Sequence, residues 1–356
     1  IDRKALTALA QQTAPVVAEA GQAPLGAAER RLAAAWATVL GVPVEQVGRT
    51  DHFFESGGTS LTAVKLSIAL ERAVSLKDIT RTPVLADLAA LLDGTARRHG
   101  ELLQPLTDGD GGEGALVCFP YAGGNAVNFR PLASALADSG LTVLAVDLPG
   151  HDVAAHQEPF ASIAQVAEQV SAEIVARGLT RVMLWGHSSG AAPAIETARR
   201  LADRGVRVTR VFIGAQLLGT AEQRAAAVAE LGGLGDAEIA ARLTADGGYT
   251  ELAELNEAHA EHIGAAYRHD CVAAHHYFRA ALGAPEPPRL SAPVTVVVAA
   301  DDPHTAGSAA LHQDWLRLAE QVELHELADG GHYFPRTRPA EAARAVLRAA
   351  VPLATS

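Results

Sequence analysis

Residues 182–202 read VMLWGHSSGAAPAIETARRLA. This stretch joins an apolar run, Val182–Trp185, to a helical pattern over 191–202, with only GHSSG between them. A serine with glycines two positions before and after it, between a strand and a helix, is typical of a sharp turn that exposes the hydroxyl. Glycines are needed there because the turn brings neighbouring backbone too close for side chains. The sequence therefore predicts a strand, a tight turn with Ser188 at its apex, and a helix.

Short apolar runs and helical patterns alternate on both sides of this stretch. Such alternation is expected for a mostly parallel sheet covered by helices. Between about 216 and 282 the strands stop, and a helical pattern rich in Ala and Glu continues for too long to be an ordinary loop. Residues 115–356 are therefore predicted to form an α/β domain with a helical lid over about 216–282. Its predicted strands are Ala115–Phe119, Thr142–Val146, Val182–Trp185, Val208–Ile213 and Val294–Ala299.

A serine hydroxyl is a weak nucleophile near neutral pH, so Ser188 needs a base to accept its proton and an acid to orient that base. His332 follows two glycines that let a loop carry it over the turn, and it is the predicted general base. Asp301 and Asp302 follow a predicted strand, and only one of these neighbours can face the histidine. We predict Asp302 as the acid, with Asp301 as the alternative. His187 is predicted to be structural or pocket lining, because adjacent residues on a tight turn point their side chains apart.

Negative charge that develops on a carbonyl oxygen during attack needs hydrogen-bond donors that are fixed in advance. The predicted donors are the backbone N–H groups of Ser189, at the start of the helix, and of Ala122, in the sequence PYAGG. Gly123 and Gly124 also fit an ordinary tight turn. Both interpretations can hold, because such a turn would present the Ala122 amide.

The N-terminal part of the chain carries a second serine in a glycine-containing turn. Helical patterns over 26–40, from Ser60 to about Val74, and after Thr82-Pro83 predict a small helical bundle over 23–94. Ser60 follows GGT and begins one of these helices, where an attached phosphodiester would meet free N–H groups and the positive end of the helix dipole. The alternative is that Ser60 only caps the helix. Polar, Gly-rich residues 95–114 are predicted to be a flexible linker.

The sequence LGVPVEQVGRTDHFFESGGTSL, residues 40–61, resembles the peptidyl carrier proteins of nonribosomal peptide synthetases, whose motif is D-x-F-F-x-x-G-G-x-S-L. The resemblance implies a four-helix carrier with 4′-phosphopantetheine attached to Ser60. The GG pair favours a peptidyl carrier over a polyketide-type acyl carrier. The chain departs from the family at Ala73–Lys77, where the connection is shorter than usual. IDRKAL resembles the end of an adenylation domain, so residues 1–22 are expected to be the tail of such a domain in a larger synthetase.

The stretch from about 115 to 352 resembles thioesterase domains of the α/β-hydrolase superfamily, because FPYAGGN, VDLPGH, GHSSG and GGHYF match in order. Integrated release thioesterases often carry the acid after the strand that follows the nucleophile strand. Here that place reads Ile213-Gly214-Ala215 and offers no carboxylate. The acid is instead expected after the later strand, as in stand-alone type II editing thioesterases, which the segment YRHDCVAAHHYF also resembles. Fusion to a carrier nonetheless favours terminal release, by hydrolysis or by cyclisation.

Composition excludes several other classes. The chain has 29 basic and 41 acidic residues and a net charge of −12, which disfavours nucleic-acid binding. Its two cysteines lack the spacing of a disulfide framework or a metal site. We found no apolar stretch long enough to span a membrane and no signal-peptide pattern, so a cytoplasmic protein without membrane contacts is expected.

These observations together predict a peptidyl carrier and thioesterase pair from the terminal module of a nonribosomal peptide synthetase. The resemblance implies several partners: upstream condensation and adenylation domains, a phosphopantetheinyl transferase, and an acyl or peptidyl thioester substrate. Two alternatives stay open. One is a hydrolase of small soluble esters with an accessory helical domain, and the other is a carrier and docking module without chemistry.

Overall fold

A computed structural model describes residues 22–70, 73–92, 101–107, 114–152, 158–245 and 257–350. The chain divides into two compact units: Ile1–Val74 with Thr82–Arg97, and Ser75–Arg81 with Arg98–Ser356. The predicted adenylation-domain tail, residues 1–22, lies outside the described residues except for Gln22.

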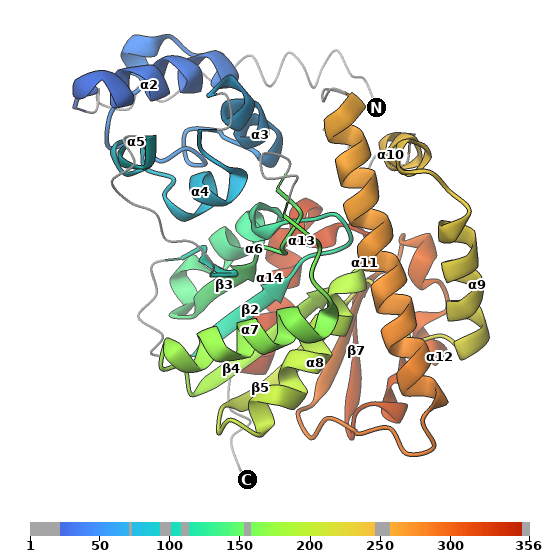
Figure 1. Cartoon of the computed structure of the whole chain (residues 1–356). Coiled ribbons are helices and arrows are strands. Elements are labelled where there is room, and N and C mark those ends of the chain that lie inside the picture. The colour runs from blue at the N-terminus through green and yellow to red at the C-terminus, as the bar shows by residue number, and fades with distance from the viewer. Residues whose placement is uncertain are drawn as a thin grey trace. The chain divides into compact units, whose positions relative to one another are not determined.

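The N-terminal region is helical, as predicted (Figure 1). Helix α2 ends at Leu40, and the next residue, Gly41, has a φ of 69°, the left-handed conformation that commonly closes a helix. In the described part of residues 22–92 the helical elements are α2 (Gly26–Leu40), the 3₁₀ turn η1 (Val44–Gln46), α3 (Ser60–Ala69), α4 (Leu76–Arg81) and α5 (Leu85–Leu92).

The core of the first unit forms where α2 packs against α3 and α5. Trp36 of α2 and Phe53 are fully buried, with ring centroids 4.9 Å apart and planes at 81°, an edge-to-face arrangement that suits two aromatic rings. Leu66 of α3 and Leu88 of α5 are also fully buried. Apolar residues at helical spacing therefore meet in one core, which is the pattern that predicted these helices.

Helix α3 is shorter than predicted, because it ends at Ala69 and does not continue to about Val74. Two hydrogen bonds explain the difference. The buried Ser67 hydroxyl donates to the Val74 carbonyl (2.6 Å), and the Ser75 amide donates to the Asp78 carboxylate (2.9 Å). The second of these bonds lies at the start of the separate helix α4, which falls in the second compact unit by the division given above.

The second unit is built on a sheet of seven strands in the described residues, in the order β1-β3-β2-β4-β5-β6-β7. Every neighbouring pair is parallel except β1 and β3. The mostly parallel sheet is thus confirmed. The strands are β1 (Leu103–Pro105), β2 (Ala115–Phe119), β3 (Thr142–Val146), β4 (Arg181–His187), β5 (Arg207–Gly214), β6 (Val294–Ala299) and β7 (Val322–Leu327).

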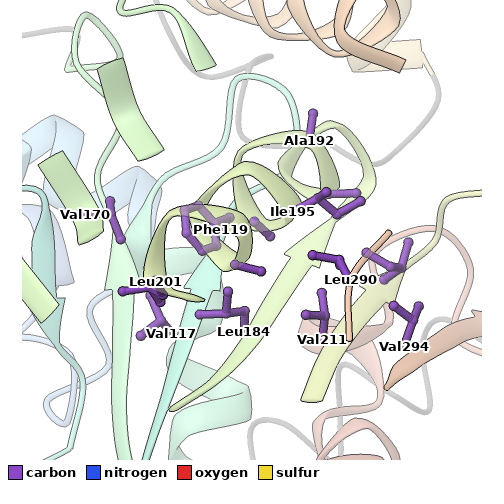
Figure 2. Packing of buried hydrophobic residues seen from close by; sticks show 14 of the residues in the cluster. Val117, Phe119, Val170, Leu184, Ala192, Ile195, Leu201, Val211, Leu290 and Val294 are labelled. Carbon is purple, nitrogen blue, oxygen red and sulfur yellow. The ribbon is translucent and has the colours of Figure 1, made fainter. Parts of the chain in front are cut away.

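Helices cover both faces of this sheet. Alternate residues of each strand point to opposite faces, so each strand contributes buried residues to two cores. Figure 2 shows one face, where Ile195 and Leu201 of helix α8 (Ala191–Ala202) lie against Phe119 and Leu184. Helix α7 (Ile163–Ala176) covers the same face. The other face packs against α6 (Arg130–Ala135), α13 (Phe334–Thr337) and α14 (Pro339–Ala350). A short helix, α12 (Ser308–Leu311), lies between β6 and β7 in the chain.

The prediction of a flexible linker over 95–114 is wrong for residues 101–107. Leu103–Pro105 form strand β1, which pairs antiparallel with β3. Leu102 and Leu103 are buried, and the Glu173 carboxylate accepts hydrogen bonds from both of their amides (2.7 and 2.8 Å). Two apolar residues with satisfied backbone groups suffice to attach this segment to the sheet, although its neighbours in sequence are polar.

The insertion between β5 and β6 is helical, as predicted. Its described residues include α9 (Ala221–Gly232), α10 (Asp236–Ala245) and the long helix α11 (Glu257–Gly283), yellow to orange in Figure 1. Helix α11 packs against both α9 and α10. These three helices are called the lid below. None of the helices that the structure describes is both long enough and apolar enough to cross a membrane.

Candidate active site

Ser188 occupies a strained turn between β4 and α8. It opens a single 3₁₀ turn, Ser188–Gly190, and its φ of 52° lies in the left-handed region. A non-glycine residue rarely adopts this conformation, and such strain is often found at functional sites. The predicted strand, turn and helix are therefore present, with the serine at the apex.

The two glycines of the turn are required by close backbone contacts. A Cβ atom on Gly186 would lie 2.5 Å from Ala191 Cα, and one on Gly190 would lie 2.5 Å from the Phe119 carbonyl oxygen. Neither contact can be relieved by rotating a side chain, because the atoms that would collide belong to the backbone. The spacing of the glycines around Ser188 thus has the physical cause that the sequence suggested.

His332 and Asp302 form a hydrogen-bonded pair at the ends of neighbouring parallel strands. His332 Nδ1 donates to Asp302 Oδ2 at 2.9 Å, and the Asp302 side chain is fully buried. With Nδ1 holding the proton, Nε2 of the neutral ring is the basic atom. Burial raises the pKa of Asp302, but the hydrogen bond and charge of His332 outweigh it and lower that pKa below its ordinary value. Asp302 is therefore a carboxylate at neutral pH.

Asp301 has a different environment from its neighbour. Its exposed carboxylate accepts hydrogen bonds from the amides of Gly331 (2.7 Å) and Gly330 (3.2 Å), which lower its pKa. Both glycines have positive φ, 130° for Gly330 and 63° for Gly331. Asp301 thus holds the loop that carries His332, whereas Asp302 contacts the imidazole itself.

His187 lies beneath this loop and is fully buried. Its Nε2 donates to the His332 carbonyl oxygen at 2.7 Å. Burial lowers the pKa of His187 to about 3, so the ring is neutral at physiological pH. A Cβ on residue 214 would lie 2.6 Å from His187 Nδ1, which explains the glycine at that place. The predicted structural role of His187 fits this arrangement.

One cavity of about 690 Å³ brings the predicted residues together. Ser188, Asp302, His332, Ala122 and Ser189 all line it. The lid forms another part of its wall, through Arg224 of α9, Leu243 of α10, and Tyr267, Cys271, Ala274 and His275 of α11. The arrangement places a strained serine, a histidine–carboxylate pair and two candidate amide donors around one space.

Arg224 is a buried cavity residue that sequence reasoning missed. Its guanidinium donates to the Leu217 carbonyl oxygen (2.6 Å) and to His275 Nδ1 (3.1 Å). Burial and the neighbouring charge of Arg224 lower the pKa of His275 to about 4, so this histidine accepts as a neutral ring. A single arginine in an Ala-rich helical pattern carries no signal of burial in the sequence.

Ser60 begins helix α3 but does not cap it. The cap is Thr59, whose side chain accepts from the Thr62 amide, while the Thr62 hydroxyl accepts from the Thr59 amide (2.6 Å). The alternative that Ser60 serves only as an N-cap is therefore wrong.

The turn before Ser60 needs both of its glycines. Gly57 has a φ of 95°, and a Cβ on Gly58 would lie 2.5 Å from the Phe53 carbonyl oxygen. The turn thus packs on the buried Phe53 ring and leaves Ser60 half-buried beside the exposed Thr59. A hydroxyl in the first turn of a helix, with an exposed neighbour, fits the attachment of a phosphate ester.

Comparisons with known proteins match two separate parts of the chain to two families. The thioesterase domain family matches residues 115–350, and the phosphopantetheine attachment site family matches residues 30–92, which include α4. Indigoidine synthase of Streptomyces lavendulae is 30% identical over 220 residues, 60% of this chain and 17% of that protein. Indigoidine synthase of Dickeya dadantii is 30% identical over 197 residues, 54% of this chain and 13% of that protein. The chain thus spans less than a fifth of either relative.

Among solved structures, the type II thioesterase BorB from the borrelidin biosynthetic cluster is similar, with a TM-score of 0.58 and 25% identity. The similarity covers 72% of this chain and all of BorB. Since the thioesterase model matches well over half of the residues, the chain belongs to the thioesterase family and carries a phosphopantetheine attachment domain ahead of its thioesterase domain.

Proposed function

We propose that this chain releases a carrier-bound acyl or peptidyl group through an acyl intermediate on Ser188, as the last step of a nonribosomal peptide assembly line. The observation that carries the proposal is the single cavity shared by the strained Ser188 and the His332–Asp302 pair. Ser60 would hold 4′-phosphopantetheine, and this group supplies the thiol through which the substrate is carried as a thioester.

The first half of the reaction forms the acyl-serine. His332 Nε2 takes the Ser188 hydroxyl proton while Oγ attacks the thioester carbonyl carbon. The Asp302 carboxylate accepts the hydrogen bond from Nδ1–H, which leaves Nε2 as the basic atom, and its negative charge stabilises the imidazolium that forms. The amides of Ser189 and Ala122 donate to the carbonyl oxygen as it gains negative charge. The C–S bond then breaks, and the departing sulfur takes the proton from Nε2.

The second half releases the product. His332 Nε2 removes a proton from water, which gives a free acid, or from a hydroxyl or amine of the substrate, which gives a lactone or lactam. The incoming oxygen or nitrogen forms a bond to the acyl carbon, and Ser188 Oγ leaves with the proton from Nε2. The lid forms part of the cavity wall, so its side chains would govern how much water reaches the acyl group.

The test follows the acyl group on the intact chain. The apo protein is incubated with a phosphopantetheinyl transferase and an acyl-coenzyme A donor, and intact-protein mass is recorded over time. Wild type should gain and then lose the acyl mass, Ser188→Ala should gain and retain it, and Ser60→Ala should never gain it. Ser56→Ala, an exposed serine in the same turn region as Ser60, is the matched control and should behave as wild type.

Two outcomes would contradict the proposal. Loss of the acyl group from Ser188→Ala at the wild-type rate would remove the serine from the reaction. Wild type that never loads, but cleaves simple esters, would instead support a hydrolase of soluble esters. The mass of the small product separates the two release routes, because a hydrolysed acid is heavier than the cyclised product by one water.

A further inference from the structure

Besides His332 and Asp302, a second histidine–aspartate pair is buried, formed by His151 and Asp270. His151 Nε2 donates to Asp270 Oδ2 at 2.7 Å, and His151 Nδ1 donates to the Pro149 carbonyl oxygen at 3.0 Å. The two side chains are 5% and 9% exposed. Both ring nitrogens face oxygen atoms, and an imidazolium paired with a carboxylate satisfies both contacts. Asp270 belongs to lid helix α11, whereas His151 lies in the loop after β3.

The charges of this pair support each other. Burial alone would raise the pKa of Asp270, but the charge of His151 and hydrogen bonds from His151, His269 and Gly123 outweigh it and lower that pKa to about 2. Burial likewise opposes the charge on His151, yet the carboxylate of Asp270 raises the pKa of that imidazole above its ordinary value. A buried ion pair with these additional hydrogen bonds holds its geometry firmly.

The same carboxylate oxygen reaches the turn that carries the Ala122 amide. Asp270 Oδ2 accepts from the Gly123 amide at 2.9 Å. Within the turn, the Gly124 amide donates to the Tyr121 carbonyl oxygen (2.8 Å), and Gly123 has a φ of 68°. A Cβ on Gly123 would lie 3.4 Å from the backbone oxygen of Ile263 on α11, so the turn packs directly on this helix.

We infer that Asp270 is a positioning residue for the reaction proposed above: by holding the Gly123 amide, it fixes the adjacent Ala122 amide relative to Ser188 and makes the oxyanion site depend on the place of lid helix α11. The peptide planes on either side of Ala122 share its Cα atom, so fixing the Gly123 N–H restricts how the Ala122 N–H can turn. Asp270 touches neither the substrate nor the reacting atoms in this role. The inference rests on the proposed release function.

The lid offers a matched control on the same helix. His262 of α11 forms a hydrogen bond through Nε2 to the Gly150 carbonyl oxygen at 2.8 Å, next to His151 in the chain. Replacing His262 removes a contact between the lid and this loop without removing the acceptor of the Gly123 amide. A general loosening of the lid would therefore affect both variants, whereas loss of the oxyanion donor would affect only the Asp270 variants.

The experiment compares wild type, Asp270→Ala, Asp270→Asn, His262→Ala and Ser188→Ala in the full chain. Steady-state kcat and KM are measured with an acyl N-acetylcysteamine thioester, together with the affinity for an alkyl boronic acid that forms a tetrahedral adduct on serine. Asp270→Ala should lower kcat and boronate affinity by about 10- to 100-fold and change KM by less than about threefold, because removing one oxyanion donor outright costs about 100- to 1,000-fold. Asp270→Asn retains an oxygen acceptor and should recover at least a third of the wild-type kcat, and His262→Ala should stay within about threefold.

Several results would overturn the inference. It fails if Asp270→Ala keeps kcat within threefold of wild type, if His262→Ala lowers kcat as much as Asp270→Ala does, or if boronate affinity is unchanged. If Asp270→Ala does not fold at the assay temperature, Asp270→Leu, which fills more of the space and has no acceptor, takes its place with the same expectations. A Ser188→Ala variant as active as wild type would instead overturn the proposed function, so the two failures are distinguishable.

Discussion

Ser60 and Ser188 both open a helical turn after a glycine-containing segment, yet the two turns are built differently. At Ser188 the backbone is forced to a φ of 52°, and backbone atoms surround the flanking glycines. Ser60 has no such strain, and the neighbouring Thr59 supplies the cap. Ser188 depends on backbone from neighbouring elements, whereas Ser60 depends mainly on its local turn.

This difference follows from how each hydroxyl is used in our proposal. A nucleophile must be aligned with its base and with the oxyanion donors, and a rigid turn supplies that alignment before the substrate arrives. An attachment serine is modified by a separate enzyme, so it needs an accessible hydroxyl on a stable helix. Four substitutions test this contrast, in order of decreasing expected effect.

Asp302→Asn should lower kcat for thioester hydrolysis by about 10⁴-fold, because an amide in place of the carboxylate favours the wrong tautomer of His332 and stabilises its imidazolium poorly. Asp301→Asn is the matched control and should lower kcat by less than about tenfold, since the Asp301 carboxylate binds the amides of Gly330 and Gly331 and not the His332 ring. Loading of Ser60 should be unchanged in both variants. Equal losses in kcat for the two variants, measured on one thioester, would contradict the assignment of Asp302.

Gly186→Ala should destabilise the second unit by about 3 kcal/mol and abolish most release, because the added methyl would meet the backbone of Ala191 and Gly190. Gly232→Ala at the end of α9 is the control, since a Cβ there meets no atom within 4 Å. Urea unfolding monitored by circular dichroism measures both changes. A fully active Gly186→Ala variant of wild-type stability would show that the turn tolerates movement and that the contrast with Ser60 is overstated.

Acid should destabilise the second unit through His187. Burial lowers its pKa in the folded state from an ordinary 6.5 to about 3. Below pH 6.5 this histidine therefore binds a proton in the unfolded chain but not in the folded protein. Stability from this group is therefore complete above pH 6.5 and falls as pH drops toward 3, by about 2 kcal/mol between pH 7 and 5. Glutamine does not titrate in this range. Between pH 7 and 5 the free energy of unfolding of His187→Gln should therefore fall by about 2 kcal/mol less than that of wild type. Parallel pH profiles for the two proteins would disprove the assignment.

Thr59→Ala should cost the first unit about 1 kcal/mol, the usual price of losing a helix cap. Ser60→Ala should change the stability of this unit by less than about 0.5 kcal/mol, because Ser60 does not cap the helix. Calorimetry measures the first effect, and intact mass should show that Thr59→Ala still loads at its neighbouring serine. A larger stability loss for Ser60→Ala than for Thr59→Ala would reverse the roles described here.

Much of the sheet was predictable because its strands are buried on both faces. Strands β2, β3 and β6 match the apolar runs residue for residue, and the turn at Ser188 follows from its glycines. Strand β7 gives a weaker signal, since VELHEL mixes charged and apolar residues and is only partly buried. Strand β1 is three residues long and lies between polar segments, so composition alone favoured a linker there.

The candidate site was likewise only partly predictable from the sequence. Residue types and chain order identify His332 and narrow the acid to two neighbours, but the orientation of each carboxylate depends on the loop after β7. Asp270 illustrates a harder case. Its acceptor role joins a lid helix to a turn 147 residues away in the chain, and no local pattern encodes such a contact.

Strand β1 also sets an upper limit on the length of chain between α5 and the sheet. With Leu103 fixed in the sheet, the covalent path from the last residue of α5, Leu92, spans at most about 40 Å, whereas a path that stayed unattached until Ala115 would reach about 80 Å. Because effective concentration falls as about the −3/2 power of tether length, halving the path raises the effective concentration of its two ends by about threefold. Three residues of strand thus halve the covalent connection between α5 and the point where the chain joins the sheet.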